Sequence, residues 1–429
     1  MRNKYKYSLD NKTEFVEKMI FFTKEFSHSC ILHSNSSNSK SPKKYYQFDL
    51  LCAFDSIQNL DSSKNSLKKL QSLHNKKNDW LFGYISYDLK NEIFNLKSDN
   101  ISVFDNDNIN FFIPKHVIII KDNNLIIESI EKESEVLEFL NQIHNYHFEK
   151  EDLKKINFLS RESRASYLEK IKHIKNHIQR GDIYEMNFCQ EFYKEDIEIS
   201  PQNLFYTLNN LTQSPFATFL NLNTFSVIGA SPERFLLKEG NEIISQPIKG
   251  TSKRGLNVQE DALLAKKLSQ SSKDISENTM IVDLVRNDLS ITAKPASVKV
   301  EKLCGVYTFS HVHQMISTIS STLKEKNNFV DVLSTTFPMG SMTGAPKIKA
   351  MQLIEKYEES KRDVYSGSVG YITPKGDFDF NVIIRSLLYD SEKKHLSFTV
   401  GGAIVSKSEA INEYEECLIK AKPIFQIFS

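Results

Sequence analysis

The order of apolar segments along this chain is the feature that most constrains its fold. In the second half of the sequence, segments that favour β-strands come in adjacent groups, and helical segments stand between the groups instead of following every strand. The predicted strands lie at 215–237, 243–251, 366–373, 380–390 and 395–405, and the predicted helices lie at 258–271, 274–288, 345–358 and 408–421. Parallel strands need a long crossover, usually a helix, whereas antiparallel strands can be joined by short turns. The pattern therefore predicts an α+β fold with mostly antiparallel sheet.

Two polar stretches interrupt the first part of the sequence. Residues 34–44 are rich in serine and asparagine and predict a mobile loop, and residues 60–79 form a second polar stretch rich in lysine and asparagine. Apolar runs between and after them, such as 110–120, predict strands.

A charged stretch at 148–156 is the best candidate for a boundary within the chain. Directly after it, the apolar residues of 167–178 recur at helical spacing, and Gly181 supplies a C-terminal stop for that helix. We therefore expect an N-terminal part, 1–155, and a larger C-terminal part, 156–429.

The composition argues against several classes of protein. The 429 residues carry 55 Lys and Arg against 54 Asp and Glu, so there is no basic footprint for nucleic acid. The first residues lack an apolar signal segment, and no apolar run is long enough to span a bilayer. Five scattered cysteines, none at a C-x-x-C spacing, favour neither a zinc site nor a disulfide framework. We therefore expect a cytoplasmic protein that binds neither nucleic acid nor membranes.

The run Pro-Ile-Lys-Gly-Thr at 247–251 is the strongest local signal for chemistry. It places Lys249 in a tight, strand-like segment sixteen positions after Glu233. A lysine pKa is ordinarily near 10.4, so this amine must be desolvated to act as a nucleophile at neutral pH. A fall of its pKa to about 7–8 corresponds to ~4 kcal/mol of differential interaction. The alternative is an ordinary surface lysine at the end of a strand.

The last predicted helix carries acidic residues on one stripe. Glu413, Glu416 and Lys420 stand at i, i+3 and i+7, beside the apolar face of the helix. One interpretation is a solvated salt-bridge ladder. The other is a Mg²⁺ site, because Mg²⁺ needs only one or two protein carboxylates together with its substrate. Glu277, among apolar neighbours on another helix, is the candidate second ligand.

Three further features are candidates for contact with a ligand, and two of them have structural alternatives: a capped helix after a tight turn at 340–347, and a bulge or tight turn at 401–403. The loop 340–347 leads into a helix, with Thr343 as a candidate cap and Pro346 in the first turn, and it does not fit a P-loop. The small residues at 401–403 follow a strand and let a ligand approach closely. Arg385 lies in an otherwise apolar strand and needs a partner, for which a substrate carboxylate is one candidate.

These segments together resemble the chorismate-utilising enzymes. The matching stretches follow one another in the expected order over residues 160–429, at 181–188, 231–235, 247–251, 277–288, 340–347, 365–371, 384–386, 401–405 and 413–420. A weaker match, Gly-Tyr-Ile-Ser-Tyr-Asp at 83–88, lies in the N-terminal part. Lys249 stands where anthranilate synthases have alanine, and the chain looks most like the aminodeoxychorismate synthase component I (para-aminobenzoate synthase component I) group of the family.

The resemblance implies a fold and a division of the chain. It implies antiparallel sheets packed as a sandwich with helices on the outside. The N-terminal subdomain, 1–155, would be of the anthranilate synthase component I type, and 156–429 would be the chorismate-binding catalytic domain. The sequence departs from the family pattern at Glu185, where glutamine is usual, at Gln314, where histidine is common, and at Ala403, where a third glycine is commoner.

The resemblance also implies a reaction. Lys249 would attack C2 of chorismate as the 4-hydroxyl leaves, and ammonia would then add at C4 and expel the lysine. The product would be 4-amino-4-deoxychorismate, a precursor of para-aminobenzoate and folate. Glu233 would be the general acid/base, and Glu277 and Glu416, with Glu413 beside them, would hold Mg²⁺. The expected substrate-binding residues are Gly250, Thr251, Tyr365, Arg385, Gly401, Gly402, Ala403 and Lys420.

The resemblance implies a partner as well. No cysteine of the chain lies in a Gly-x-Cys-x-Gly elbow, so ammonia would come from a separate glutamine amidotransferase subunit. Anthranilate synthase component I is the alternative activity. A regulatory or scaffolding subunit without activity is the alternative from another class, although it would not need Lys249, Glu233 and the carboxylates together.

Overall fold

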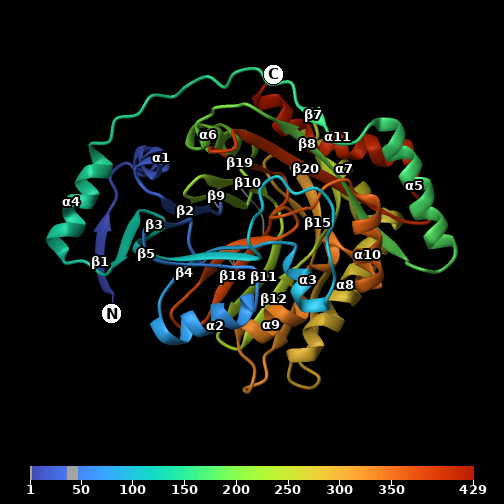
Figure 1. Ribbon diagram of the computed structural model, residues 1–429, viewed down its shortest axis with the longest axis horizontal. Coiled ribbons are helices and arrows are strands. Elements are labelled where there is room, and N and C mark those ends of the chain that lie inside the picture. The colour runs from blue at the N-terminus through green and yellow to red at the C-terminus, as the bar shows by residue number, and fades with distance from the viewer. Residues whose placement is uncertain (1, 36–46) are drawn as a thin grey trace.

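Figure 1 shows the computed structural model of the chain, which describes residues 2–35 and 47–429. Helices lie around the outside of a strand-rich centre (Figure 1). From residue 36 on, the polar segment predicted as a loop at 34–44 lies outside the described residues. No helix in the two described ranges is long and apolar enough to cross a bilayer.

The strands of the described residues are β1 (Asn3–Ser8), β2 (His28–His33), β3 (Leu50–Ser62), β4 (Leu81–Ile85), β5 (Ile109–Lys121), β6 (Asn124–Ser129), β7 (Leu159–Ser160), β8 (Glu185–Lys194), β9 (Phe216–Leu222), β10 (Phe225–Ser231), β11 (Arg234–Glu239), β12 (Glu242–Gln246), β13 (Ile248–Lys253), β14 (Lys299–Thr308), β15 (Val312–Thr322), β16 (Gly344–Ala345), β17 (Ser368–Ile372), β18 (Phe378–Val382), β19 (Ser386–Asp390) and β20 (His395–Ile404). The α-helices are α1 (Lys12–Phe22), α2 (Ser66–Lys77), α3 (Leu89–Phe94), α4 (Glu133–His144), α5 (Arg164–Gln179), α6 (Pro201–Thr212), α7 (Val258–Ser269), α8 (Ser272–Thr292), α9 (Phe329–Thr336), α10 (Lys347–Tyr357) and α11 (Ala410–Ile427). Short 3₁₀ turns occur at η1 (Thr23–Glu25) and η4 (Gly340–Met342).

The sheet is antiparallel, as the grouping of strands predicts. Among the described residues, every ladder between two of these strands runs antiparallel, and only the isolated bridge between Ile101 and Ser360 is parallel. Helices enter the chain between groups of strands, so the α+β prediction is confirmed.

Three apolar clusters show how the layers pack. The middle cluster contains Phe82 of β4 and Leu220 of β9 and draws only on strands and loops, so it lies between sheet layers. Phe219, next to Leu220, belongs instead to a cluster that includes residues of α1, α4, α5, α6 and α11, because successive strand side chains point to opposite faces. A third cluster joins strands to α2, α8 and α9. Sheets therefore pack on one another with helices outside, as expected.

The N-terminal part of the chain shares the sheet of the C-terminal part. Strand β2 pairs with β9, and β4 pairs with β17, so hydrogen-bonded ladders cross the predicted boundary at residue 155. The boundary itself stays a prediction.

Two helix ends differ from the predictions. Helix α10 begins at Lys347, so Pro346, whose backbone is extended, precedes the first turn instead of entering it. Thr343 does not cap this helix, because its hydroxyl donates to the carbonyl of Met339 at 3.2 Å. Helix α11 continues to Ile427, through Pro423, beyond the predicted end at 421. Residues Cys417, Ala421 and Ile424 are buried, and this apolar face continues past the proline.

Candidate active site

One cavity of about 460 Å³ collects the residues that the sequence singles out. This is the size of a small-molecule site. Every expected site residue except Gly402 lines it: Glu233, Lys249, Gly250, Thr251, Glu277, Tyr365, Arg385, Gly401, Ala403, Glu413, Glu416 and Lys420. Gly402 lies next to two side chains of this cavity, because a Cβ there would lie 3.5 Å from Glu413 Oε2 and 3.7 Å from Lys420 Nζ.

Lys249 lies in β13 and forms a close ion pair. Its Nζ donates to Glu185 Oε1 of β8 at 2.8 Å, and the two side chains are only 10% and 1% exposed. Burial lowers the pKa of Lys249, but the charge and hydrogen bond of Glu185, with smaller contributions from Glu277 and Glu233, outweigh it and raise the pKa above its ordinary value. The lowered pKa expected from the sequence is therefore wrong for the free protein. Desolvation is present, but a buried carboxylate faces the amine.

Glu233 lies in an environment that favours its uncharged form. It lies between β10 and β11, is buried, and accepts a hydrogen bond from Ser341 Oγ at 2.7 Å. Burial raises its pKa to about 7, although Ser341, Lys249 and Arg385 each favour the charged form. A carboxyl group with a pKa near neutrality can both give and accept a proton, so Glu233 is suited to general acid/base chemistry.

Arg385 is held in an unusual backbone conformation at the cavity wall. Its φ is +51°, in the left-handed region that arginine rarely adopts, between β18 and β19. Within the described part of the chain, its side chain makes no hydrogen bond or ion pair. Burial lowers its pKa, and Glu233 is the charge that opposes this. A guanidinium without a protein partner in a cavity is well suited to bind a carboxylate.

Three glutamates of the cavity face two lysines. Glu413 of α11 is 3% exposed, and Lys273 of α8 places its Nζ 3.8 Å from Glu413 Oε1 and 4.0 Å from Glu277 Oε1. Lys420 pairs with Glu416 at 2.8 Å and donates to the carbonyl of Gly401 at 2.9 Å. The Glu416–Lys420 pair is the one a surface ladder would have, and its side chains are 44% and 33% exposed, whereas those of Glu277 and Glu413 are 13% and 4% exposed.

Their electrostatics distinguish the three glutamates. Burial raises the pKa of Glu277 to about 7 and also raises the pKa of Glu413. For Glu416, burial is outweighed by the charge of Lys420, so its pKa is lowered. Bringing a cation to Glu277 and Glu413 would relieve the cost of burying their charged forms.

The oxygen donors here suit Mg²⁺ better than zinc. Glu277 Oε1 is buried and has no hydrogen-bond partner among the described residues. In the same part of the chain, no three His, Cys, Asp or Glu side chains form a group that could hold a metal unaided. Mg²⁺ commonly takes one or two carboxylates and completes its shell with water and substrate. Glu277 and Glu416, with Glu413 beside them, could therefore hold it.

Glycines allow the strands of the site to approach closely. Gly401 pairs with Cys189 across β20 and β8, and a Cβ on Gly401 would lie 2.3 Å from Cys189 Sγ. Gly250 has φ +89°, and a Cβ there would lie 2.9 Å from the side chain of Asp274. Both positions therefore require glycine.

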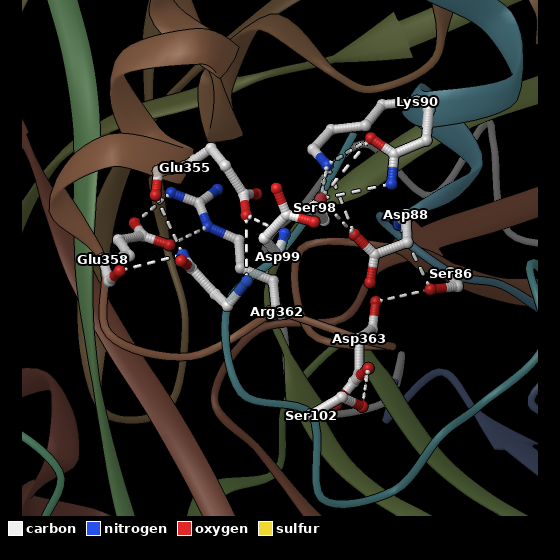
Figure 2. Close-up of polar contacts among 12 residues, drawn as sticks. Ser86, Asp88, Lys90, Ser98, Asp99, Ser102, Glu355, Glu358, Arg362 and Asp363 are labelled. Atoms are coloured by element: carbon white, nitrogen blue, oxygen red, sulfur yellow. Dashed lines mark hydrogen bonds and ion pairs between the residues drawn. The ribbon is translucent and has the colours of Figure 1, made fainter. Parts of the chain in front are cut away.

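A buried polar network supports the loop that carries Tyr365. Figure 2 shows Arg362 against Glu358, and Asp363 against Ser86 and Ser102 of the N-terminal part. Arg362 also donates to the carbonyls of Met342 and Asn187, both cavity residues. Tyr365 itself is 4% exposed, with its hydroxyl 3.7 Å from Cys189 Sγ. The segment that matches the family weakly at 83–88 thus helps to hold a cavity wall.

Several residues that line the cavity or contact its side chains were not among the expected site residues. Glu185 contacts Lys249, Ser341 contacts Glu233, and Lys273 contacts the glutamates. Gln314, on β15, has both amide atoms buried without a partner in the described chain, so its polar atoms are available to a ligand. The sequence marked Glu185 and Gln314 only as departures from a family pattern. For Ser341 and Lys273, only neighbouring residues in the sequence had been singled out, and nothing marked these two themselves.

The chain is similar in sequence to known proteins of one family. The sequence model of the family described as chorismate binding enzyme matches residues 27–426. Aminodeoxychorismate synthase component 1 of Escherichia coli is 38% identical over 264 residues, which is 62% of this chain and 58% of that protein. Anthranilate synthase component 1 of Aquifex aeolicus is 36% identical over 305 residues, 71% of this chain and 60% of that protein. The chain therefore spans about three-fifths of these curated relatives.

Solved structures show the same fold. The chain superposes on anthranilate synthase component I from Streptococcus pneumoniae with a TM-score of 0.78, 24% identity, and coverage of 87% of this chain and 91% of that one. It superposes on the menaquinone-specific isochorismate synthase of Escherichia coli with a TM-score of 0.79, 14% identity, and coverage of 100% and 94%. With the family model matching nearly the whole sequence, the chain belongs to the chorismate binding enzyme family.

Proposed function

We propose that this protein is an aminodeoxychorismate synthase component I, which converts chorismate and ammonia into 4-amino-4-deoxychorismate for para-aminobenzoate and folate synthesis. The observation that carries the proposal is Lys249, an amine whose side chain is only 10% exposed and which lines the same cavity as the acid Glu233. The names of relatives such as those of Escherichia coli and Klebsiella aerogenes, at 38% and 39% identity, support it.

The reaction assigns one task to each side chain. The neutral amine of Lys249 attacks C2 of chorismate, the ring double bonds shift, and the C4–O bond breaks. Glu233 gives its proton to the departing hydroxyl, which leaves as water. Ammonia then forms the C4–N bond as the C2–lysine bond breaks, and Glu233 takes back a proton from the new ammonium group. Chorismate and ammonia thus become 4-amino-4-deoxychorismate and water.

The remaining side chains bind and orient the substrate. Arg385 and Lys420 offer positive charge to the carboxylates of chorismate, and Tyr365 and the backbone at 401–403 close the cavity around them. Gly250 and Thr251 shape the wall next to Lys249. Mg²⁺, held by Glu277 and Glu416 with Glu413 beside them, would neutralise a substrate carboxylate when bound.

The proposal includes a partner and a compartment. A separate glutamine amidotransferase subunit would supply ammonia, and the name "component 1" of the relatives is consistent with a second component. The cysteines, all unpaired, fit a reducing compartment such as the cytoplasm.

Anthranilate synthase component I is the second candidate. It is favoured by relatives of that name that match a longer part of this chain, 71% in Aquifex aeolicus and 72% in Lactococcus lactis. The experiment that separates the two is incubation of the purified protein with chorismate, Mg²⁺ and ammonium, followed by identification of the product by mass and fluorescence. Aminodeoxychorismate supports the proposal. A fluorescent ortho-amino product, anthranilate, would refute it.

A further inference from the structure

Lys249, which lines the cavity, forms an ion pair with Glu185, a buried residue that is not part of the cavity lining. The pair joins β8 to β13 across 64 positions of sequence, with Nζ and Oε1 at 2.8 Å. Glu185 is 1% exposed, and its second oxygen, Oε2, is buried without a hydrogen-bond partner among the described residues. Each hydrogen-bond donor stabilises a charged carboxylate, and among the described residues this carboxylate has only Lys249 as a donor.

Other acidic side chains of the cavity act on the ion pair. Glu233, Glu277 and Glu416 all act on Lys249 through their charges, and each favours the ammonium form when ionised. The free protein therefore holds Lys249 as an ammonium ion, which has no lone pair and cannot attack carbon. A nucleophilic role needs a group that removes one proton from this amine, and Glu185 is the carboxylate in contact with it.

We propose that Glu185 is the proton acceptor for Lys249: it keeps the amine charged in the free protein and takes its proton when an anionic substrate occupies the cavity. This rests on the proposed function of Lys249. In the transfer, the N–H bond of the ammonium breaks and an O–H bond forms on Glu185, so an ammonium and a carboxylate become a neutral amine and a carboxylic acid. When the lysine leaves the adduct as a neutral amine, it takes its proton back from Glu185.

The substrate supplies the driving force. Chorismate fills the cavity and excludes water from the Lys249 amine, and loss of water disfavours the charged forms of both the amine and the Glu185 carboxylate. Proton transfer within the pair removes both of its charges without releasing a proton to solvent. The Lys249 amine therefore stays protonated until the substrate binds, and becomes nucleophilic only inside the filled cavity.

The first test measures Lys249 in the free protein, without chorismate or Mg²⁺. Cyanate reacts with neutral amines, so peptide mass spectrometry after a short exposure reports how much of each lysine is uncharged, with exposed Lys299 as internal standard. At pH 8.5, Lys249 of Glu185→Gln should react at least about tenfold faster than that of the wild type, equivalent to one pKa unit. Glu185→Asp, which keeps a carboxylate, should stay near wild type.

A matched control comes from the same strand. Glu191 of β8 is also buried and pairs with Arg161 at 3.0 Å, outside the contact with Lys249. Glu191→Gln should leave the Lys249 reactivity unchanged. Equal Lys249 reactivity in wild type and Glu185→Gln would overturn the proposal. So would a wild-type reactivity that levels off below pH 9, a result that needs no variant.

The second test uses turnover. The measured quantity is kcat/KM of Glu185→Gln divided by kcat/KM of the wild type. This ratio removes the pH dependence that comes from groups titrating alike in both proteins. Without an internal acceptor, Lys249 must lose its proton to solvent, so the ratio should rise about tenfold per pH unit between pH 6 and 8. A ratio independent of pH would mean that Glu185 has only a structural role. Absence of wild-type turnover would refute the proposed function, whereas the cyanate result refutes only the role of Glu185.

Discussion

Replacing Glu233 with glutamine should make the protein more stable at alkaline pH, while it removes the general acid. In the folded protein, burial raises the pKa of Glu233 to about 7 from an ordinary value of 4.5. Between these two values the folded state holds a proton that the unfolded chain has released. The free energy of unfolding therefore falls as pH rises through this window, and the loss is complete above pH 7.

The size of the effect follows from the two pKa values. Each unit is 1.36 kcal/mol, so this carboxyl group costs the wild type about 2–3 kcal/mol between pH 5 and pH 8. Glu233→Gln has no proton to lose, and its amide oxygen can still accept the hydrogen bond from Ser341. The difference in unfolding free energy between variant and wild type should therefore grow by that amount from pH 5 to pH 8.

Urea denaturation at the two pH values, without chorismate or Mg²⁺, measures this difference. Glu242→Gln, an exposed carboxylate at the start of β12, is the control and should show no such growth. If wild type and Glu233→Gln change in parallel between pH 5 and pH 8, Glu233 is not a buried acid of raised pKa. The assignment of Glu233 as general acid would then lose its physical basis.

Two further perturbations test the metal ligands and the strand contact. Glu277→Gln should raise the Mg²⁺ concentration for half-maximal activity by roughly 10–100-fold, and EDTA should abolish wild-type activity until Mg²⁺ is restored. The control is Glu415→Gln, an exposed position on α11. An unchanged Mg²⁺ requirement in Glu277→Gln would exclude Glu277 as a ligand. Gly401→Ala should lower the unfolding free energy by about 1–3 kcal/mol, because its methyl group meets Cys189 Sγ. Denaturation curves that coincide with wild type would show that the methyl group is accommodated between β8 and β20 without cost.

Local patterns were sufficient to predict much of the fold. The predicted strands and helices between 215 and 429 correspond to elements of the structure, and helical spacing alone placed Glu413 and Glu416 on one side of α11. Strands β8 and β14 and helices α6 and α9 were not among the predicted elements. Helix α2, by contrast, lies inside the polar stretch 60–79. Three leucines, Leu67, Leu70 and Leu73, make its contact with the core, too few to distinguish it from a polar connection.

The electrostatics of the site depended on contacts that no local pattern contains. The pairing of Lys249 with Glu185 joins two strands far apart in sequence, and its effect on the lysine pKa is opposite to that of burial alone. The hydrogen bond from Ser341 to Glu233 spans 108 positions. Residue types could suggest which groups carry chemistry, but their protonation depends on neighbours that only the fold brings together.

The most direct test of the account is a search for a covalent bond between Lys249 and the substrate. Wild-type protein, incubated with chorismate and Mg²⁺ but without ammonia, should gain the mass of chorismate less one water, and peptide mapping should place the gain on Lys249. Lys249→Ala should gain nothing. A wild-type protein that makes aminodeoxychorismate while Lys249 stays unmodified, or a Lys249→Ala variant with full activity, would contradict the central claim.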